Sequence, residues 1–318
     1  MELIISNISS IFLIVAVGVV ANKAGVLPMS ASKYLSSLLL KVTCPCIVLS
    51  SVTSNTLSED TLAITIQALV GSCLFFYIAG FIGHFLAKKV FRTHPDEPGM
   101  YAIAFGSANN GFIGFPITLA LFGSSILYIM VIHNIAMQVF YLYSLGPMIL
   151  NAGSGKGRVN MDGLINSAKN PNTIAAVIGF IMLFAGLKFP APMFDCFEMI
   201  GSATTPLSML LVGMQLGECD FWEMLKNKTL LIMSVIKMAV IPVLTFAALF
   251  WLPVEPEVKV GLVFAASFPI AVAVVPVASE ENKDALLLAE MVTITTLMSM
   301  VMIPLAASLL ISIYGISA

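Results

Sequence analysis

Ten stretches of mostly apolar residues, each close to the length of a membrane-spanning helix, divide the chain. A spanning helix requires about 20 such residues, and short polar segments separate the stretches. They cover residues 3–22, 32–54, 62–87, 99–122, 125–150, 172–188, 194–216, 228–252, 258–279 and 285–313. The first stretch has no preceding basic segment and no small-residue cleavage site, so we expect a span rather than a signal peptide. The sequence therefore predicts an all-α polytopic membrane protein with ten transmembrane helices.

The composition agrees with this fold class and excludes several others. Of 318 residues, 59% are hydrophobic and 10% are charged, with a mean hydropathy of +1.00. A soluble domain carries about 25% charged residues. The net charge is -2, and there is no basic tract to bind a nucleic acid. The sequence also lacks a G-x-x-x-x-G-K-[ST] motif, so we expect no nucleotide partner.

The cysteines do not form a metal-binding or disulfide pattern. Their number is odd, most lie in apolar stretches, and none has Cys or His neighbours at zinc spacing. They are Cys44, Cys46, Cys73, Cys196 and Cys219. We expect them to pack as small hydrophobic side chains, and we expect neither a metal nor an organic cofactor.

The distribution of basic residues predicts how the spans are oriented. With the amino terminus outside, eleven of the fifteen Lys and Arg residues fall in cytoplasmic loops. They are Lys23, Lys33, Lys88, Lys89, Arg92, Lys156, Arg158, Lys169, Lys226, Lys228 and Lys283. Because Lys and Arg resist translocation, this asymmetry favours ten spans with both termini outside. We expect a multi-pass protein of the plasma membrane, which in a bacterium is the inner membrane.

The chain divides into two halves at its most hydrophilic loop, residues 151–170. An offset of 160 or 161 residues aligns markers in residues 1–150 with markers in residues 171–318. The aligned pairs are Thr43 with Thr204, Ser107 with Ser267, and Pro116 with Pro276. Each half holds five spans, an odd number, so the second half is inverted relative to the first. Inverted repeats of this kind are typical of secondary transporters.

The fourth span is interrupted by residues that disfavour a helix. Residues 106–116 contain the adjacent asparagines Asn109 and Asn110 and three glycines, including Gly114, and end on Pro116. In a helix interior, Gly costs about 1 kcal/mol and Pro about 3 kcal/mol relative to Ala. Freed backbone groups at membrane depth occur where they line a cavity or lie buried in protein. The two side-chain amides can donate hydrogen bonds to a carboxylate there.

The ninth span has a matching interruption at Ser267 and Pro269, followed by Pro276. Paired broken helices in inverted halves point to a substrate site. We expect half-helices that begin near Pro116 and Pro276 to direct their positive dipole ends at an anionic substrate. The alternative is a pair of proline kinks whose neighbouring amides bond adjacent helices.

Three motifs are spread over nearly the whole chain. They are Asn109-x4-Gly114-x-Pro116 in the fourth span, Lys169-Asn170-Pro171-Asn172-Thr173 with Ile178-Gly179 at the sixth, and Lys237 followed by Pro242 in the eighth. Together they resemble the auxin efflux carrier family, which includes plant auxin exporters and bacterial carboxylate permeases. The short central loop is similar to that of the compact bacterial members.

This resemblance implies ten helices in two inverted five-helix repeats. Helices 1, 2, 6 and 7 would form a scaffold that also makes a homodimer. Helices 3–5 and 8–10 would form a transport domain that moves like an elevator. Family members carry small organic anions such as auxin, malonate or malate. On this chain the resemblance implies that Asn109 and Pro116 lie at the crossover of the fourth helix, with Pro269 and Pro276 near that of the ninth.

Charged and titratable residues at membrane depth are further candidates. Lys41, close to Thr43, and Lys237 each lie about ten residues into a span, where a charge is expensive and indicates a functional site. Each lysine could pair with a substrate carboxylate or hold a fixed acidic or carbonyl partner. Glu290 lies in the last span, where it could couple an ion or snorkel to the interface. His133 could relay protons or bond a neighbouring helix.

Several functions remain open. The sequence favours a secondary carrier of a small organic anion. An ion gradient would drive it, and H⁺ and Na⁺ are the candidate coupling ions. One alternative is a sodium-coupled carrier similar to the bile-acid symporters, and another is a channel or membrane sensor built on the same fold. An enzyme is not expected, because the sequence contains neither H-E-x-x-H nor G-x-S-x-G and no close pair of intramembrane carboxylates.

Overall fold

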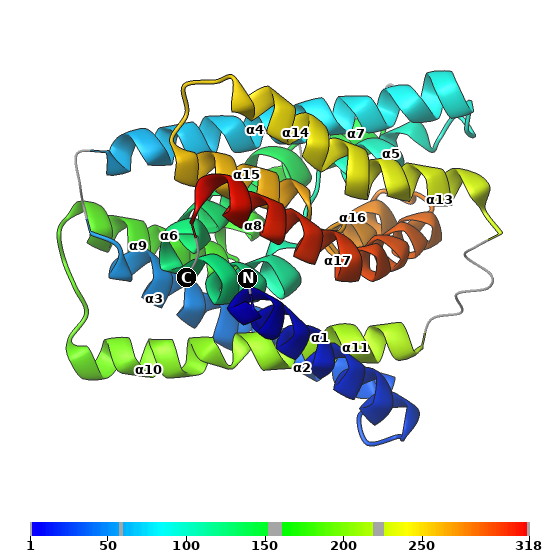
Figure 1. The fold of residues 1–318 in the computed structure, drawn as a ribbon. Helices are drawn as coiled ribbons and strands as arrows, with labels where there is room; N and C mark the ends of the chain where they lie inside the picture. The colour runs from blue at the N-terminus through cyan, green and yellow to red at the C-terminus, as the bar shows by residue number, and fades with distance from the viewer. Residues whose placement is uncertain (1, 57–59, 152–160, 219–225, 317–318) are drawn as a thin grey trace.

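The computed structural model describes residues 2–56, 60–151, 161–218 and 226–316 (Figure 1). Within these ranges every regular element is helical, and there is no strand. The prediction of an all-helical protein is therefore confirmed for the described part of the chain.

The helices follow one another in a single series. The first half forms α1 (Glu2–Lys23), η1 (Met29–Ala31), α2 (Ser32–Leu38), η2 (Leu39–Thr43), α3 (Cys44–Ser54), α4 (Thr61–Phe85), η3 (Leu86–Phe91), α5 (Pro98–Phe105), η4 (Asn110–Gly114), α6 (Phe115–Ala136), η5 (Met137–Leu142) and α7 (Gly146–Leu150). The second half forms α8 (Met161–Ala168), α9 (Pro171–Phe184), α10 (Ala191–Ser202), α11 (Thr204–Gly217), α13 (Lys228–Val235), η6 (Ile236–Val240), α14 (Ile241–Phe250), α15 (Pro256–Ala266), α16 (Val274–Glu280) and α17 (Ala285–Tyr314). Elements η2 to η6 are π-helical segments, whereas η1 is a short 3-10 helix.

Six helical segments in the described residues are long and apolar enough to cross a membrane. They are Met29–Ser54, Thr61–Phe91, Pro98–Leu142, Ala191–Gly217, Lys228–Phe250 and Ala285–Tyr314. Two shorter apolar helices cover Ser9–Lys23 and Pro171–Phe184. The chain is therefore a multi-pass, membrane-embedded protein. Ten crossings in an inverted arrangement stay a prediction, since the ninth predicted span is divided between α15 and α16, and each part is too short to cross alone.

The longest segment, Pro98–Leu142, contains the fourth and fifth predicted spans. Inside α6, Gly123 has φ 74° and ψ −167°, a backbone conformation that a residue with a Cβ rarely adopts. The helix is therefore interrupted at Gly123, between the predicted spans at residues 99–122 and 125–150.

Helices α1 and α11 pack closely through glycines. A Cβ added to Gly213 would lie against the backbone oxygen of Val15 and 2.8 Å from Cα of Gly18. Small residues at such crossings let two helices approach each other within the membrane. Helix α3 packs against both α9 and α10. In Figure 1, α10 and α11 run along the bottom of the molecule, and α4 and α14 run along the top.

Most buried apolar side chains belong to two large clusters. One joins α1, α3, α6, α9, α11, α15 and the carboxyl end of α17. The other joins α4, α5, η5, α16 and the amino end of α17. Because α4, α6, α15 and α17 contribute to both clusters, these four helices connect the two sides of the core.

The Asn-Pro-Asn-Thr motif marks the beginning of a helix. Oδ1 of Asn170 accepts a hydrogen bond from the backbone N–H of Asn172 at 2.9 Å, and Pro171 is the first residue of α9. An asparagine cap satisfies one of the free N–H groups of the first turn, and a proline at the next position has no N–H to satisfy. The motif is therefore explained by the local requirements of the first turn of α9.

The predicted linker, residues 151–170, is described in part. Residues 152–160 lie outside the described residues, and the remainder includes the short helix α8. Cys219 also lies outside them. The other four cysteines are unpaired: Cys44 and Cys46 are buried, Cys73 is half-buried and Cys196 is exposed.

Candidate functional site

The first helix break lies between α5 and η4. Helix α5 ends at Phe105, residues 106–109 leave the helical path, and η4 begins at Asn110. The α-helical part of this half-helix, α6, begins at Phe115, near Pro116 as the sequence predicts, and the π-helical η4 extends it back to Asn110. Pro116 lies in the first turn of α6, which continues directly from η4. A proline in the first turn of a helix removes an N–H that has no obligatory helical partner.

The second helix break lies between α15 and α16. Helix α15 ends at Ala266 and α16 begins at Val274, so residues 267–273 are not helical. Helix α16 begins at Val274, near Pro276 as the sequence predicts, and Pro276 lies exposed in its first turn. The interruption that the sequence predicts at Ser267 and Pro269 is present.

The two breaks contact each other through their backbones. The N–H of Asn109 donates to the carbonyl oxygen of Pro269 at 2.8 Å. The N–H of Ala271 donates to Oγ of Ser107 at 3.3 Å, and this hydroxyl in turn donates to the carbonyl oxygen of Ala104 at 3.0 Å. Buried backbone groups that leave a helix need such partners, because no water is available in the hydrocarbon core. The breaks therefore satisfy each other's hydrogen bonds.

Other contacts hold the second break in place. The N–H of Ile270 donates to Oγ1 of Thr295, on α17, at 3.2 Å. Ser267 is buried, and its hydroxyl donates to a carbonyl one turn earlier in α15 at 3.0 Å. Gly114 lies so close to Phe268 that an added Cβ would be 3.3 Å from the phenylalanine ring. The first break and the second are thus packed tightly together.

The two asparagines have different surroundings. Oδ1 of Asn109 accepts a hydrogen bond from the backbone N–H of Phe112 at 3.3 Å and caps η4. The side chain of Asn110 is 1% exposed, and neither its Oδ1 nor its Nδ2 has a hydrogen-bond partner in the described residues. A buried amide without partners costs about 1–3 kcal/mol. Asn110 is therefore the side chain at the breaks with free capacity to bind a ligand.

The junction of η2 and α3 lies against η4, the helical segment that follows the first break. Sγ of Cys44 is 3.6 Å from the carbonyl oxygen of Gly111. Thr43 is buried, and its Oγ1 has no hydrogen-bond partner among the described residues. Lys41 lies in the same π-helical segment but is exposed. Of these two candidates, only Thr43 offers a buried polar atom.

Phe112 joins the break to this side of the molecule. It is half-buried and packs against a small cluster formed by Leu39, Cys44 and Leu211. The contact is apolar and comes from η2, α3 and α11. Any movement of the break relative to these helices has to separate Phe112 from the cluster.

A second buried polar cluster lies on α4, α6 and η6. Nδ1 of His133 is 3.0 Å from Oγ of Ser72. Lys237 is completely buried, and its Nζ lies 5.3 Å from the ring centroid of Phe75 without a hydrogen-bond partner in the described ranges. The Phe75 ring is also 5.5 Å from the imidazole ring of His133. Glu290 is half-buried on α17. The structure therefore brings His133 and Lys237 to the same aromatic side chain.

Three residues of these clusters were not identified from the sequence: Thr295, Ser72 and Phe112. Serine and threonine in a helix commonly donate to the carbonyl one turn earlier. The hydroxyls of both Thr295 and Ser72 do so, at 2.8 and 2.6 Å. No sequence signal distinguishes such a hydroxyl from one that also contacts another helix.

Several candidates lie in π-helical segments. Lys41 and Thr43 belong to η2, Asn110 and Gly114 to η4, and Lys237 to η6. π-Helical turns are rare and occur frequently at functional sites. No group of three or more His, Cys, Asp or Glu side chains within the described ranges could hold a metal ion.

A multi-pass membrane protein with two mutually bonded helix breaks has the architecture expected of a transporter. The comparisons with known proteins agree. The chain belongs to the family described as "Membrane transport protein", whose model matches residues 3–307, and the resemblance to the auxin efflux carrier family is thereby confirmed. The protein is a membrane transporter.

Proteins similar to this chain occur in several organisms. The chain is 24% identical over 304 residues to the uncharacterized transporter MJ1031 of Methanocaldococcus jannaschii, covering 93% of this chain and 95% of the relative. It is 23% identical over 301 residues to an uncharacterized transporter of Methanothermobacter thermautotrophicus, covering 94% and 96%. It is 24% identical over 225 residues to the uncharacterized transporter YfdV of Escherichia coli, covering 68% and 70%.

Proposed function

We propose that this transporter is a secondary carrier of a small organic anion, and that the anion binds where the two helix breaks meet. The observation that carries the proposal is Asn110, whose buried side-chain amide has no hydrogen-bond partner in the described residues. A carboxylate can accept from the Nδ2 group, which replaces part of the hydration that the anion loses. The substrate class is a mono- or dicarboxylate such as malonate, malate or an auxin-like acid.

Two further groups support an anion at this place. Thr43 carries a buried hydroxyl that can donate to a second carboxylate oxygen. Its neighbour Cys44, the first residue of α3, contacts Gly111, the neighbour of Asn110 in η4. The half-helix that begins at Asn110 adds a positive dipole end, and such ends stabilise negative charge. Together these groups give an anion donors from both sides.

The proposal includes an arrangement of ten spans in two inverted repeats. Helices 1, 2, 6 and 7 form the scaffold and a homodimer interface, and helices 3–5 and 8–10 form the moving domain. The contacts of α1 with α11, and of α3 with α9 and α10, support the grouping of the scaffold helices. In an elevator movement, the two breaks travel together, because the bond between Asn109 and Pro269 and that between Ala271 and Ser107 lie within the moving domain.

Ion gradients would drive the cycle in the plasma membrane, with both termini outside. His133, Lys237 and Glu290 are the proposed coupling or relay residues, and H⁺ or Na⁺ is the proposed coupling ion. The buried contact between His133 and Ser72 supports a role of this cluster in coupling or relay. The partners of the protein are then the anion, the lipid bilayer and a second copy of the chain.

Transport assays with purified protein test the function. The full-length chain is reconstituted in liposomes, and uptake of labelled malonate, malate, succinate and indole-3-acetate is measured with a pH gradient, with a sodium gradient and without either. We expect saturable uptake of at least one acid. Asn110→Ala should lower its uptake by about tenfold or more, because a charge-assisted hydrogen bond contributes about 1.5–3 kcal/mol. Asn172→Ala is the matched control, since Asn172 is also buried and its Oδ1 also lacks a described partner.

The outcomes separate the alternatives. Normal uptake by a folded Asn110→Ala variant contradicts the proposed site. If folded protein takes up none of the acids, the carboxylate proposal fails, and an unlisted substrate or a sensor function takes its place. Uptake only with a sodium gradient favours the carrier similar to bile-acid symporters.

A further inference from the structure

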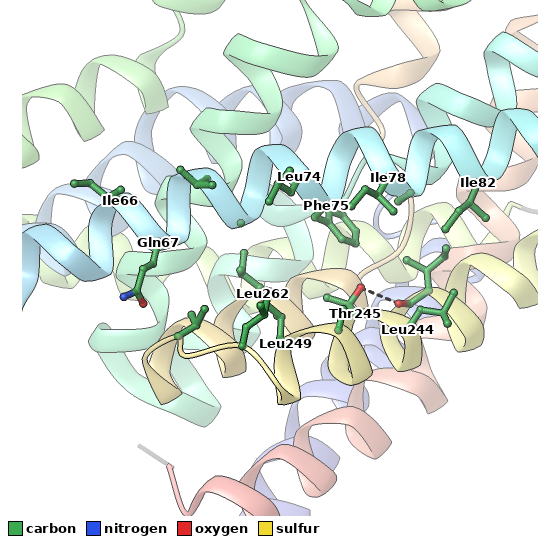
Figure 2. A pocket seen from close by; sticks show the side chains of 17 residues that line it. Ile66, Gln67, Leu74, Phe75, Ile78, Ile82, Leu244, Thr245, Leu249 and Leu262 are labelled. Carbon is green, nitrogen blue, oxygen red and sulfur yellow. Dashed lines mark hydrogen bonds between the residues drawn. The ribbon is translucent and has the colours of Figure 1, made fainter.

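A long apolar groove runs between α4 and α14, on the side of the molecule opposite α10 and α11 (Figures 1 and 2). We define the α4–α14 groove by its lining residues between Ile66 and Ile82 on α4 and between Ile241 and Leu249 on α14, with Leu262 at its floor. Its volume is about 440 Å³. On α4 the lining residues recur every three or four positions over about 24 Å of helix, given a rise of about 1.5 Å per residue.

The lining of the groove is almost entirely hydrocarbon. Figure 2 shows Leu74, Ile78 and Ile82 facing Leu244 and Leu249 across the groove. Two polar side chains line it, and both are already bonded to the backbone. Oε1 of Gln67 accepts from the N–H of residue 255 at 2.9 Å, and Oγ1 of Thr245 donates to the carbonyl of residue 241 at 2.8 Å.

The groove opens toward the bilayer. Ile66, Val70, Leu74 and Ile78 line it and are more than half exposed, and both α4 and α14 belong to segments that can cross a membrane. In a membrane this surface faces lipid tails, so an occupant has to present a hydrocarbon chain rather than a polar group.

Behind the groove lies a buried lysine, Lys237. Phe75 lines the groove, and its ring centroid is 5.3 Å from Nζ of Lys237. Lys237 is 0% exposed, and its Nζ has no hydrogen-bond partner among the described residues. An aromatic face attracts a cation only weakly, by less than the penalty of removing an ammonium group from water. An anion beside Nζ would supply the partner that stabilises the charged form of Lys237.

We propose that the α4–α14 groove binds an amphipathic anion with one long hydrocarbon chain, a long-chain fatty acid, whose carboxylate pairs with Lys237. The chain lies along the aliphatic lining of α4 and α14. A rotation of the Phe75 side chain opens the path from the groove to the ammonium group. This site is separate from the helix breaks and does not depend on the identity of the transported anion, although it shares Lys237 with the proposed coupling residues.

The carboxylate distinguishes this proposal from ordinary contact with bilayer lipid. Any lipid tail can lie against an aliphatic groove, and a neutral chain of equal length gains the same apolar contacts. Only an acid can neutralise Lys237, and an ion pair is strong where water is excluded. The fatty acid should therefore bind more tightly than the alcohol of the same chain length.

Photolabelling of the intact protein tests this difference. Full-length protein in nanodiscs of neutral phospholipid is labelled with a palmitic acid analogue that carries a diazirine in its chain, and labelled peptides are mapped. We expect labels on α4 and α14. Unlabelled palmitate should compete about tenfold better than hexadecanol, which corresponds to about 1.4 kcal/mol. Lys237→Met, which replaces the ammonium with an apolar end, should make the two competitors equal.

Two further variants control the experiment. Lys259→Met removes a lysine of α15 whose Nζ lies 3.5 Å from the carbonyl oxygen of Phe250 and outside the groove lining, so the preference for the acid should persist. Val70→Trp fills the groove and should reduce labelling while Lys237 is intact. The proposal is overturned if palmitate and hexadecanol compete equally in the unmodified protein, if the preference survives Lys237→Met, or if Val70→Trp leaves the labelling unchanged.

Discussion

The backbone N–H of Asn109 donates to the carbonyl oxygen of Pro269 at 2.8 Å, and the two residues are 160 positions apart in the chain. The same offset relates Ser107 to Ser267 and Pro116 to Pro276. Two segments at equivalent positions of the two halves thus meet in the buried interior and bond to each other. This relationship makes the breaks a single unit, and disturbing one of them affects the other.

The cap on η4 provides the first prediction. Oδ1 of Asn109 accepts from the N–H of Phe112 at 3.3 Å. Replacing an asparagine cap with alanine costs about 0.5–2 kcal/mol, so Asn109→Ala should lower the melting temperature measured by thermal unfolding in detergent. Asn109→Asp keeps an acceptor oxygen and should recover most of that loss. An unchanged melting temperature in Asn109→Ala contradicts the capping role.

The contact between α1 and α11 provides the second prediction. A Cβ on Gly213 would collide with the backbone oxygen of Val15 and approach Cα of Gly18 to 2.8 Å. Because backbone atoms cannot move aside as a flexible side chain does, Gly213→Ala should destabilise the protein by about 1–3 kcal/mol. Gly25→Ser is the comparison at an exposed glycine. No atom lies within 4 Å of its Cβ position, so any loss of stability there comes from its φ of +73° and not from a collision. Equal melting temperatures for Gly213→Ala and the unmodified protein exclude the close packing.

Tyr141 provides the third prediction. Its hydroxyl donates to the carbonyl oxygen of Ala102 at 2.7 Å, and the side chain is 1% exposed. Tyr141→Phe removes the donor and leaves a buried carbonyl with one partner fewer, which costs about 1–3 kcal/mol. Tyr77→Phe removes a comparable bond, to the carbonyl oxygen of Phe140 at 2.8 Å, at an exposed position. Because no water can replace either bond at membrane depth, we expect both variants to lower the melting temperature, and an unchanged value for Tyr141→Phe would contradict the argument.

The ion pair between Lys283 and Asp96 should contribute little. Nζ of Lys283 lies 3.5 Å from Oδ1 of Asp96, and the side chain of the aspartate is 65% exposed. Exposed ion pairs contribute about 0–1 kcal/mol because water and salt screen them. Asp96→Asn should therefore lower the melting temperature by no more than about 4 °C, given about 2–4 °C per kcal/mol. A large loss of stability would show that this ion pair holds together the loops that contain Asp96 and Lys283.

The proposed orientation of the spans can be tested by thiol labelling in whole cells. Lys89 and Lys188 are both exposed, and the ten-span topology puts Lys89 in the cytoplasm and Lys188 outside. In a variant without the natural cysteines, Lys188→Cys should react with a membrane-impermeant maleimide added outside. Lys89→Cys should react only after the membrane is opened. Labelling of both from one side would contradict the predicted topology.

Much of the local structure follows from residues that are neighbours in the chain. The glycines, asparagines and prolines of residues 106–116 cannot continue a helix, and the interruptions predicted there and at Ser267 are present. The Asn-Pro pair at residues 170–171 caps α9 for an equally local reason. Helices α6 and α16 begin at Phe115 and Val274, near the predicted prolines, because proline is compatible with a first helical turn. The sequence did not predict the π-helical η4 that precedes α6.

The sequence by itself determined that this is a membrane protein, where its helices are interrupted, and which family its motifs resemble. These properties depend on runs of apolar residues and on backbone preferences within a few positions. Only the tertiary structure decided that the two breaks bond to each other, that Asn109 caps a helix while Asn110 is left without a described partner, and that Phe75 lies beside Lys237. The partner of a buried polar group depends on which distant segments pack against it, and no local pattern specifies that approach.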